Sequence, residues 1–139
     1  MSLYLDTSAL LKRYIDEDDS AACEKLLLAD PSWVTARHTW VEVLRNLGRL
    51  VQGPDRARVR QTFRADWSRM LVVELDATTC ERAGDLAETL HVRTLDALHL
   101  AAAERAGAGA LPFLTYDVRQ AHPARSPGWG RSSDGAARG

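Results

Sequence analysis

Short apolar runs alternate with helical segments along most of this chain, and this alternation restricts the fold more than any other feature of the sequence. Four such runs predict buried strands, at residues 3–5, 33–35, 71–75 and 112–115. The segments around them have helical spacing of apolar residues or end at helix-stop signals, at residues 9–15, 21–29, 38–51, 55–70, 77–90 and 94–106. Strands separated by helices imply a sheet that is covered on both faces. The sequence therefore predicts an α/β fold, a three-layer sandwich with a short, mainly parallel sheet of four to five strands flanked by helices.

Composition limits the size of the protein and the ways in which it can bind a partner. With 139 residues and 15.4 kDa, the chain is long enough for one ordinary core but short for a second. A net charge of -1 and a pI near 6.4 argue against nucleic-acid binding by bulk charge alone. The apolar stretch ahead of Asp6 is too short for a signal-peptide core or a membrane span, so we expect a cytoplasmic protein that does not enter a membrane. The two cysteines lack the spacing of a zinc site.

Acidic residues stand at or beside the ends of several predicted elements. They are Asp6, Glu42, Asp96 and Asp117. If the fold brings them together, their oxygens can hold Mg²⁺, which takes oxygen ligands in near-octahedral geometry and keeps several waters. Without a cation, the same cluster would repel itself. A magnesium site with open coordination positions suits the cleavage of a phosphodiester.

Each acidic residue also has a simpler structural interpretation. Asp6 can cap the helix that follows it. Asp96 stands in the first turn of a helix, where a carboxylate favours the helix dipole. Glu42 lies opposite the apolar stripe of its helix, so a surface pair with a neighbouring arginine explains it equally well. Asp117 can cap a turn.

Four blocks of the sequence carry a resemblance to a known family. They are YLDTSAL at 4–10, VEVLR at 41–45, RTLDALHLA at 93–101 and LTYD at 114–117. In this order and spacing they resemble the motif blocks of PIN-domain ribonucleases, specifically VapC-type toxins of type II toxin–antitoxin modules. The resemblance implies a PIN-like fold for residues 1–121 and activity as a Mg²⁺-dependent endoribonuclease toxin that cleaves single-stranded regions of RNA, with Mn²⁺ as an alternative ion. It also implies a VapB-type antitoxin that neutralises the toxin, and we expect a homodimer.

The same resemblance implies a role for each acidic residue. The metal ligands would be Asp6, Asp96 and Asp117, while Glu42 would hold a second ion or position the attacking water. Hydroxyl groups would orient these carboxylates and waters, namely those of Thr7, Ser8 and Thr115. We interpret His99, one helical turn after Asp96, as a histidine satisfied in the core or supporting the site rather than as a general base.

Other interpretations stay open at the level of the sequence. The serious rival function is a catalytically silent PIN-like module that only binds RNA or a protein. A haloacid-dehalogenase-like phosphatase would need a second aspartate where Ser8 stands, and a receiver domain would need a late lysine that is absent after Leu90. Arginines on two predicted helices have two possible interpretations: they form a solvated face, or they contact phosphate or an acidic partner. They are Arg45 and Arg49 on one helix and Arg56, Arg60 and Arg64 on the next. Packing in the core or a dimer is expected for Trp33, Trp40 and Trp67.

The end of the chain differs in composition from the rest. Residues 122–139 are rich in Gly, Ser and Arg and poor in aliphatic side chains, which predicts a loop or weakly ordered tail. We therefore expect the sheet to end at its fourth strand or to borrow a partner at that edge.

Overall fold

A parallel sheet forms the centre of the computed structural model, which describes residues 2–30, 32–107, 111–116 and 130–131. The strands in this part of the chain are β1 (Ser2–Leu5), β2 (Ser32–Ala36), β3 (Leu71–Val73), β4 (Pro112–Leu114) and β5 (Gly130–Arg131). They lie in the order β3–β2–β1–β4–β5, and each neighbouring pair is parallel. The first strand of the chain is therefore central, and its carboxyl end has a neighbouring strand on each side.

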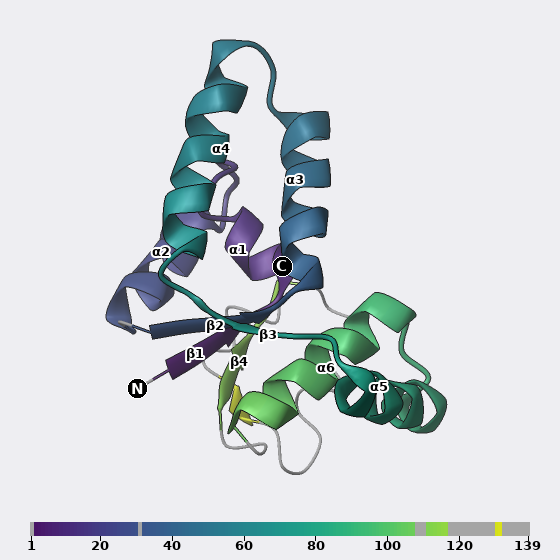
Figure 1. Cartoon of the computed structure of the whole chain (residues 1–139). Helices are drawn as coiled ribbons and strands as arrows, with labels where there is room; N and C mark the ends of the chain where they lie inside the picture. The colour runs from purple at the N-terminus through teal and green to yellow at the C-terminus, as the bar shows by residue number, and fades with distance from the viewer. Residues whose placement is uncertain (1, 31, 108–110, 117–129, 132–139) are drawn as a thin grey trace.

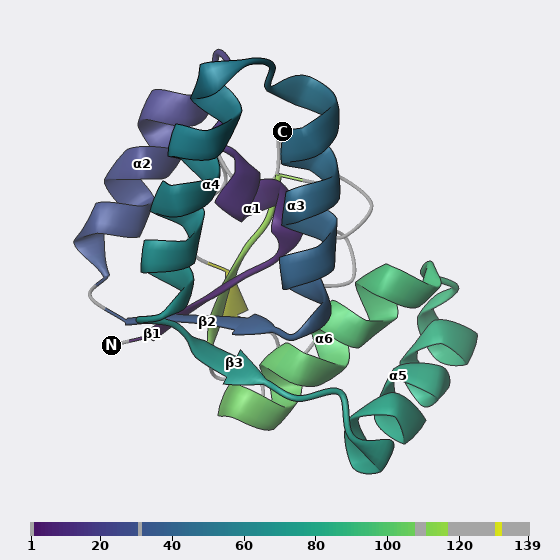
Figure 2. The ribbon, with the colours of Figure 1, turned by 45° about the horizontal axis from the view of Figure 1, so that its top comes forward.

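Helices cover both faces of this sheet. They are α1 (Thr7–Leu11), α2 (Ser20–Ala29), α3 (His38–Leu50), α4 (Pro54–Trp67), α5 (Ala77–Leu90) and α6 (Thr94–Gly107). Figures 1 and 2 show α1 to α4 on one face of the sheet and α5 with α6 on the other. The predicted α/β sandwich of three layers with a short parallel sheet is confirmed.

The sheet has a fifth strand at one edge, which is within the predicted range of four to five. Gly130–Arg131 pairs with β4, with Pro112 opposite Gly130 and Phe113 opposite Arg131. Of the two alternatives for this edge, an end at the fourth strand or an added partner, the structure has the second, because strand pairing uses backbone N–H and C=O groups, which a Gly-Arg segment also supplies. The remainder of the predicted tail at 122–139 lies outside the described residues.

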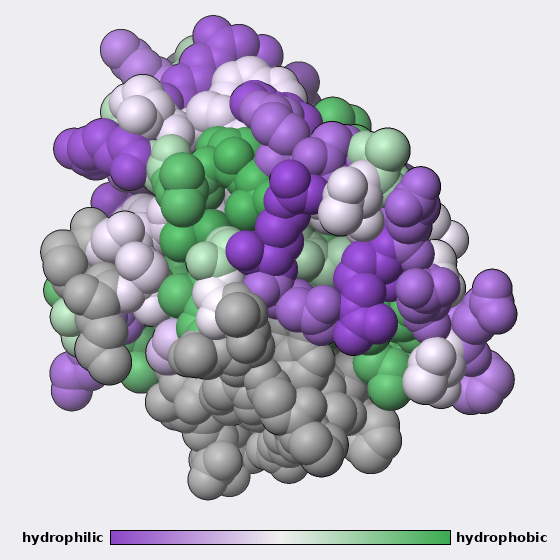
Figure 3. All heavy atoms as spheres, turned by 60° about the horizontal axis from the view of Figure 1, so that its bottom comes forward, coloured by the Kyte–Doolittle hydropathy of each residue, from purple (hydrophilic) through white to green (hydrophobic). Residues whose placement is uncertain are grey.

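Hydrophilic side chains predominate on the face shown in Figure 3, where they border a smaller hydrophobic area. Over the part of the chain that the structure describes, the large hydrophobic side chains with the greatest exposure are Leu28, Val41, Leu50, Leu71 and Leu95. They are spread over α2, α3, β3 and α6 rather than confined to one element. None of the described helices is both long and apolar enough to cross a membrane.

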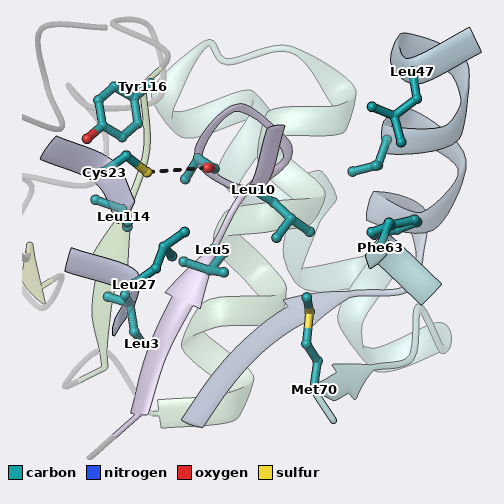
Figure 4. Close-up of a cluster of buried hydrophobic side chains, with 12 residues drawn as sticks. Leu3, Leu5, Leu10, Cys23, Leu27, Leu47, Phe63, Met70, Leu114 and Tyr116 are labelled. Carbon is teal, nitrogen blue, oxygen red and sulfur yellow. Dashed lines mark hydrogen bonds between the residues drawn. The ribbon is translucent and has the colours of Figure 1, made fainter. Parts of the chain in front are cut away.

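Alternation along β1 divides the buried side chains between two cores. Leu3 and Leu5 pack with residues of α1 to α4, whereas Tyr4 packs with residues of α5 and α6. This follows from the geometry of a strand, in which successive side chains point to opposite faces of the sheet. Figure 4 shows the first core, where Cys23 of α2 donates its thiol to the carbonyl oxygen of Ala9 at 3.5 Å.

Aromatic side chains hold α3 and α4 together within the first core. The ring centroid of Phe63 lies 5.3 Å from that of Trp40, 5.6 Å from that of Trp67 and 5.6 Å from that of Tyr14. Trp33 also packs against this core. The interpretation of these tryptophans as packing residues is confirmed.

Replacing Phe63 with alanine should destabilise the fold strongly. The ring is completely buried among other aromatic rings, so its removal leaves a cavity that costs about 3–5 kcal/mol of unfolding free energy. The measurement is equilibrium unfolding in urea. Leu28→Ala serves as a control because Leu28 is 69% exposed, and its unfolding free energy should change by no more than about 0.5 kcal/mol. Equal losses for the two variants would contradict this account of the core.

Candidate active site

Asp6 is the buried carboxylate at the carboxyl end of β1. Its Oδ1 accepts hydrogen bonds from the Ser8 hydroxyl at 2.7 Å and from the backbone N–H of Ala9 at 3.0 Å, so Asp6 is the N-cap of α1. Its Oδ2 accepts the hydroxyl of Thr115, from the end of β4, at 2.5 Å. The capping interpretation of Asp6 is therefore correct, and the Asp6 carboxylate accepts hydrogen bonds from the hydroxyls of both Ser8 and Thr115.

The position of Glu42 on α3 left a surface location open, but in the structure the side chain is only 23% exposed. Its Oε1 accepts the Thr7 hydroxyl at 2.5 Å and lies 3.1 Å from Nε2 of His99. No arginine is paired with Glu42 among the residues that the structure describes. The alternative of a surface pair between Glu42 and an arginine was wrong because α6 approaches α3 and places His99 against this carboxylate.

His99 connects the two faces of the sheet through hydrogen bonds. The side chain is 2% exposed. Its Nδ1 lies 2.8 Å from the hydroxyl of Tyr4, which lies on the face of the sheet that α5 and α6 cover. Its Nε2 faces Glu42 and lies 3.3 Å from the Thr7 hydroxyl. The interpretation of His99 as a buried histidine satisfied by hydrogen bonds is confirmed.

His38 is a further residue of this group that the sequence did not single out. It begins α3, one helical turn before Glu42, and its Nε2 lies 3.7 Å from the Oε1 of that carboxylate and 3.2 Å from the carbonyl oxygen of Leu95. The rings of His38 and His99 have centroids 4.1 Å apart. The spacing of four residues between His38 and Glu42 was the available signal, because it places two side chains on one face of a helix.

Asp96 approaches the same region from the first turn of α6. It is half-buried, and it precedes His99 by three residues, so the two side chains share one face of the helix. Its neighbour Leu95 presents its carbonyl oxygen to His38. Asp117 lies outside the described residues, but the backbone N–H of Tyr116, directly before it, donates to the Ser8 hydroxyl at 2.8 Å.

Burial acts differently on the two best-defined carboxyl groups. Burial raises the pKa of Asp6, and the influence of His99 and the hydrogen bonds from Ser8, Thr115 and Ala9 only partly oppose it. Burial alone would raise the pKa of Glu42 too, but the hydrogen bond from His99 and the neighbouring Thr7 and His38 lower it overall. Over the described residues, neither carboxyl group is paired with a lysine or an arginine. A buried carboxylate such as Asp6, held by neutral donors, is suited to bind a cation.

Burial also keeps the aromatic hydroxyl and the second imidazole of the group neutral. Burial raises the pKa of Tyr4 well above its ordinary value, helped by the negative charges of Asp6 and Glu42. Burial lowers the pKa of His38 to about 4, and the nearby His99 adds to this shift. At neutral pH, Tyr4 is therefore a phenol and His38 an uncharged imidazole.

The arginines take several separate roles. Arg56 donates to the backbone oxygens of Val51 at 2.9 Å and Gly48 at 2.5 Å, at the end of α3. Arg49 donates to the side chain of Asn46. Arg60 and Arg64 line a hollow on α4. The hydrogen bonds of Arg56 to Val51 and Gly48 stabilise the link between α3 and α4. Arg56 therefore has a structural role that the sequence did not predict.

Comparisons of sequence and of structure with known proteins agree on one family. The family model described as PIN domain matches residues 3–126. Ribonuclease VapC47 of Mycobacterium tuberculosis is 34% identical over 142 residues, which cover 98% of this chain and 99% of that protein. Ribonuclease VapC46 of the same species is 32% identical over 127 residues, covering 91% and 93%. A solved toxin-antitoxin complex from Klebsiella pneumoniae has a chain that superposes with a TM-score of 0.70 at 20% identity, covering 91% of this chain and 94% of that one.

Asp6→Asn should stabilise the protein when EDTA has removed divalent ions, because asparagine carries no charge to be buried. The pKa of Asp6 is higher in the folded state than in the unfolded state, so the native fold favours the protonated carboxyl. The stability that Asp6 contributes is therefore complete below its unfolded pKa and is lost as the pH rises through its folded pKa. The melting temperature of the variant should exceed that of the wild type at pH 7, and the difference should shrink in acid.

A matched control for this measurement is Asp85→Asn, which removes an exposed carboxylate from α5. Its melting temperature should follow that of the wild type at each pH. A deficit in Asp6→Asn that is the same at every pH would contradict the burial argument.

Proposed function

This chain belongs to the PIN domain family, and we propose that it is a Mg²⁺-dependent endoribonuclease toxin that cleaves single-stranded regions of RNA and is neutralised by a cognate antitoxin. The observation that carries the proposal is the buried carboxylate of Asp6, fixed at the centre of the sheet edge by neutral hydrogen-bond donors. Cleavage of RNA is the activity named for both VapC relatives.

The proposed ion would be held by oxygen atoms, which suits Mg²⁺ and also Mn²⁺. Asp6 and Asp96 are the ligands that we infer among the described residues, and Asp117 would complete the set. When bound, Mg²⁺ supplies Lewis-acid stabilisation of the charge on the phosphate and lowers the pKa of a coordinated water. The hydroxyls of Ser8 and Thr115 would keep the Asp6 carboxylate in one orientation, which reduces the reorganisation that binding requires.

Glu42 would act on the water that attacks the phosphodiester or hold a second ion. The described hydrogen bonds to its carboxylate, from Thr7 and His99, both reach Oε1. Both contacts hold the same oxygen of the carboxylate, and neither of them uses Oε2. Because these contacts lower the pKa of Glu42, it is ionised at neutral pH and can accept a proton or contact a cation.

A catalytically silent PIN-like binding module is the alternative function. It would keep the fold and its partners, but it would not need ionised carboxylates at the sheet edge. The burial of Asp6 favours catalysis, because asparagine would cap α1 equally well without a charge whose ionisation burial opposes. The two functions differ in one measurable respect, since only the nuclease depends on a divalent ion.

The proposed partners are an antitoxin and a second copy of the chain. The Klebsiella pneumoniae neighbour is described as a toxin-antitoxin complex. Two large hydrophobic side chains are exposed near the site, Val41 on α3 at 65% and Leu95 on α6 at 47%, and either can contribute to a protein interface. We place the protein in the cytoplasm, where RNA and a cytoplasmic antitoxin are both accessible.

Asp6→Asn and Asp96→Asn should each reduce RNA cleavage by at least about 100-fold, because each removes a charged metal ligand without changing side-chain volume. The measurement is cleavage of a labelled single-stranded RNA by purified protein in Mg²⁺, with Asp85→Asn as the control of unchanged rate. EDTA should stop the reaction and added Mg²⁺ should restore it. Equal cleavage in EDTA and in Mg²⁺ would exclude the metal-dependent mechanism.

The antitoxin should place a basic side chain among the carboxylates, because an arginine fork competes well with a metal for paired oxygens. The product of an adjacent small gene should co-purify with the protein and inhibit cleavage. Replacing its arginines by alanine, one at a time, should identify one variant that still binds but inhibits less. If expression of this chain alone is harmless to a bacterial host and no neighbouring product binds it, the toxin assignment is wrong.

A further inference from the structure

Two imidazoles and a carboxylate converge beside the Asp6 carboxylate. His38 and Glu42 come from α3 and His99 from α6, and one ligand atom of each lies within 4.8 Å of the other two. We propose that His38, Glu42 and His99 form a binding site for a divalent transition-metal ion, Zn²⁺ in the first instance, distinct from the oxygen site at Asp6. Glu42 belongs to both sites, but this inference goes beyond the proposed nuclease function, because it concerns the ion that Glu42 would share with two imidazoles and requires no cleavage of RNA.

Two of the three distances between these ligand atoms are close to those around a four-coordinate ion. Zinc binds imidazole nitrogen and carboxylate oxygen at about 2.0–2.2 Å, which places neighbouring ligands of a tetrahedron about 3.4 Å apart. The Oε1 of Glu42 is 3.1 Å from Nε2 of His99 and 3.7 Å from Nε2 of His38. The two imidazole nitrogens lie within 4.8 Å of each other, so a movement of about an ångström by one imidazole would bring all three atoms onto one ion.

The donor set favours a different class of ion from the one proposed at Asp6. Mg²⁺ is bound by oxygen ligands and seldom by imidazole, whereas Zn²⁺ and other transition-metal ions accept two histidines and a carboxylate readily. Three protein ligands would also leave one position of the ion open, as in zinc sites that bind water or a substrate group. We therefore expect Mg²⁺ to bind at Asp6 and Zn²⁺ to bind at the two histidines and Glu42.

The hydrogen bond on the far side of His99 is the kind that supports a metal ligand. A ligating histidine uses one ring nitrogen for the metal and donates the N–H of the other to a fixed acceptor. Here Nδ1 of His99 lies 2.8 Å from the hydroxyl of the completely buried Tyr4. A hydroxyl can donate or accept, so Tyr4 can donate to Nδ1 in the ion-free protein and accept from it when Nε2 binds an ion.

His38 has hydrogen-bonding capacity that the fold leaves unused. It is 9% exposed, and its Nδ1 has no hydrogen-bond partner within the described ranges. Its Nε2 faces two acceptors, the carbonyl oxygen of Leu95 and the carboxylate of Glu42, so the ring proton lies on Nε2 in the ion-free protein and moves to Nδ1 when Nε2 binds an ion. A ring that is held at only one nitrogen can adjust toward an ion more easily than a fully bonded one.

The test uses Co²⁺, which reports its ligands by visible absorption, on full-length protein freed of metal with EDTA. A site with imidazole ligands and low coordination number gives a much stronger visible band than Co²⁺ in an all-oxygen octahedral site. The band should appear with about one equivalent of Co²⁺ in the wild type, disappear on addition of Zn²⁺ and persist in excess Mg²⁺. A wild type without the band would overturn the proposal.

Variants locate the site. His38→Gln should lose the band, whereas Asp6→Asn should keep it, and His91→Gln, which changes an exposed histidine at the end of α5, should also keep it. Circular dichroism must show that each variant is folded. Loss of the band in Asp6→Asn with retention in His38→Gln would place the ion at the carboxylates instead and refute the proposal.

A measurement on the wild type removes any dependence on the folding of variants. Ring ¹⁵N spectra recorded with and without Zn²⁺ should show changes at the nitrogens of His38 and His99, while those of His91 stay in place. Zinc-induced changes that leave both His38 and His99 unaffected would also refute the site.

Discussion

The way in which Asp6 is held where β1 ends determines much of the remaining structure. Its backbone N–H donates to the carbonyl oxygen of Leu114 at 3.3 Å, which continues the pairing of β1 with β4. Its side chain caps α1 through Ala9 and accepts the hydroxyls of Ser8 and Thr115. One residue therefore ends the central strand, begins the first helix and joins two loops at the sheet edge. The carboxylate can make all of these contacts only in a buried position. Burial also makes it suitable to bind a cation.

The alternation of side chains on β1 extends the site to the second layer of helices. Tyr4 lies on the face opposite to Leu3 and Leu5, so its hydroxyl reaches His99 of α6 across the interior of the protein. His99 in turn contacts Glu42 of α3, on the other side of the sheet edge. The parallel sheet thus allows helices from both layers to contribute to one group of polar side chains. Such a group is stable only when its members satisfy each other, and the contacts among Tyr4, His99, Thr7 and Glu42 do this.

Two buried acidic residues of this fold, Asp66 and Asp6, have different hydrogen-bond partners. These partners indicate a structural role for Asp66 and a role in cation binding for Asp6. Asp66 is as deeply buried as Asp6, but it accepts hydrogen bonds from Arg13 at 2.8 Å, Tyr14 at 2.6 Å and Arg69 at 3.1 Å. Although burial opposes it, this pairing lowers the pKa of Asp66, whereas the pKa of Asp6 is raised. A carboxylate that already has arginine partners has no need of a metal. The difference in partners, rather than the degree of burial, distinguishes the structural acid from the candidate ligand.

The sequence by itself determined the elements of this protein, because helix periodicity, caps and short apolar runs depend on residues within a few positions of each other. The range predicted for α5 agrees with the observed one, and most other elements differ by one to three residues at their ends. It also identified Asp6, Glu42 and Asp96 as candidate residues. Only the tertiary structure decided their surroundings. Glu42 was open to a surface interpretation until packing placed it beside His99, which is 57 residues away. The role of His38, the contact of Tyr4 with His99 and the pairing of β5 with β4 likewise depend on how distant segments meet, and no local pattern encodes that.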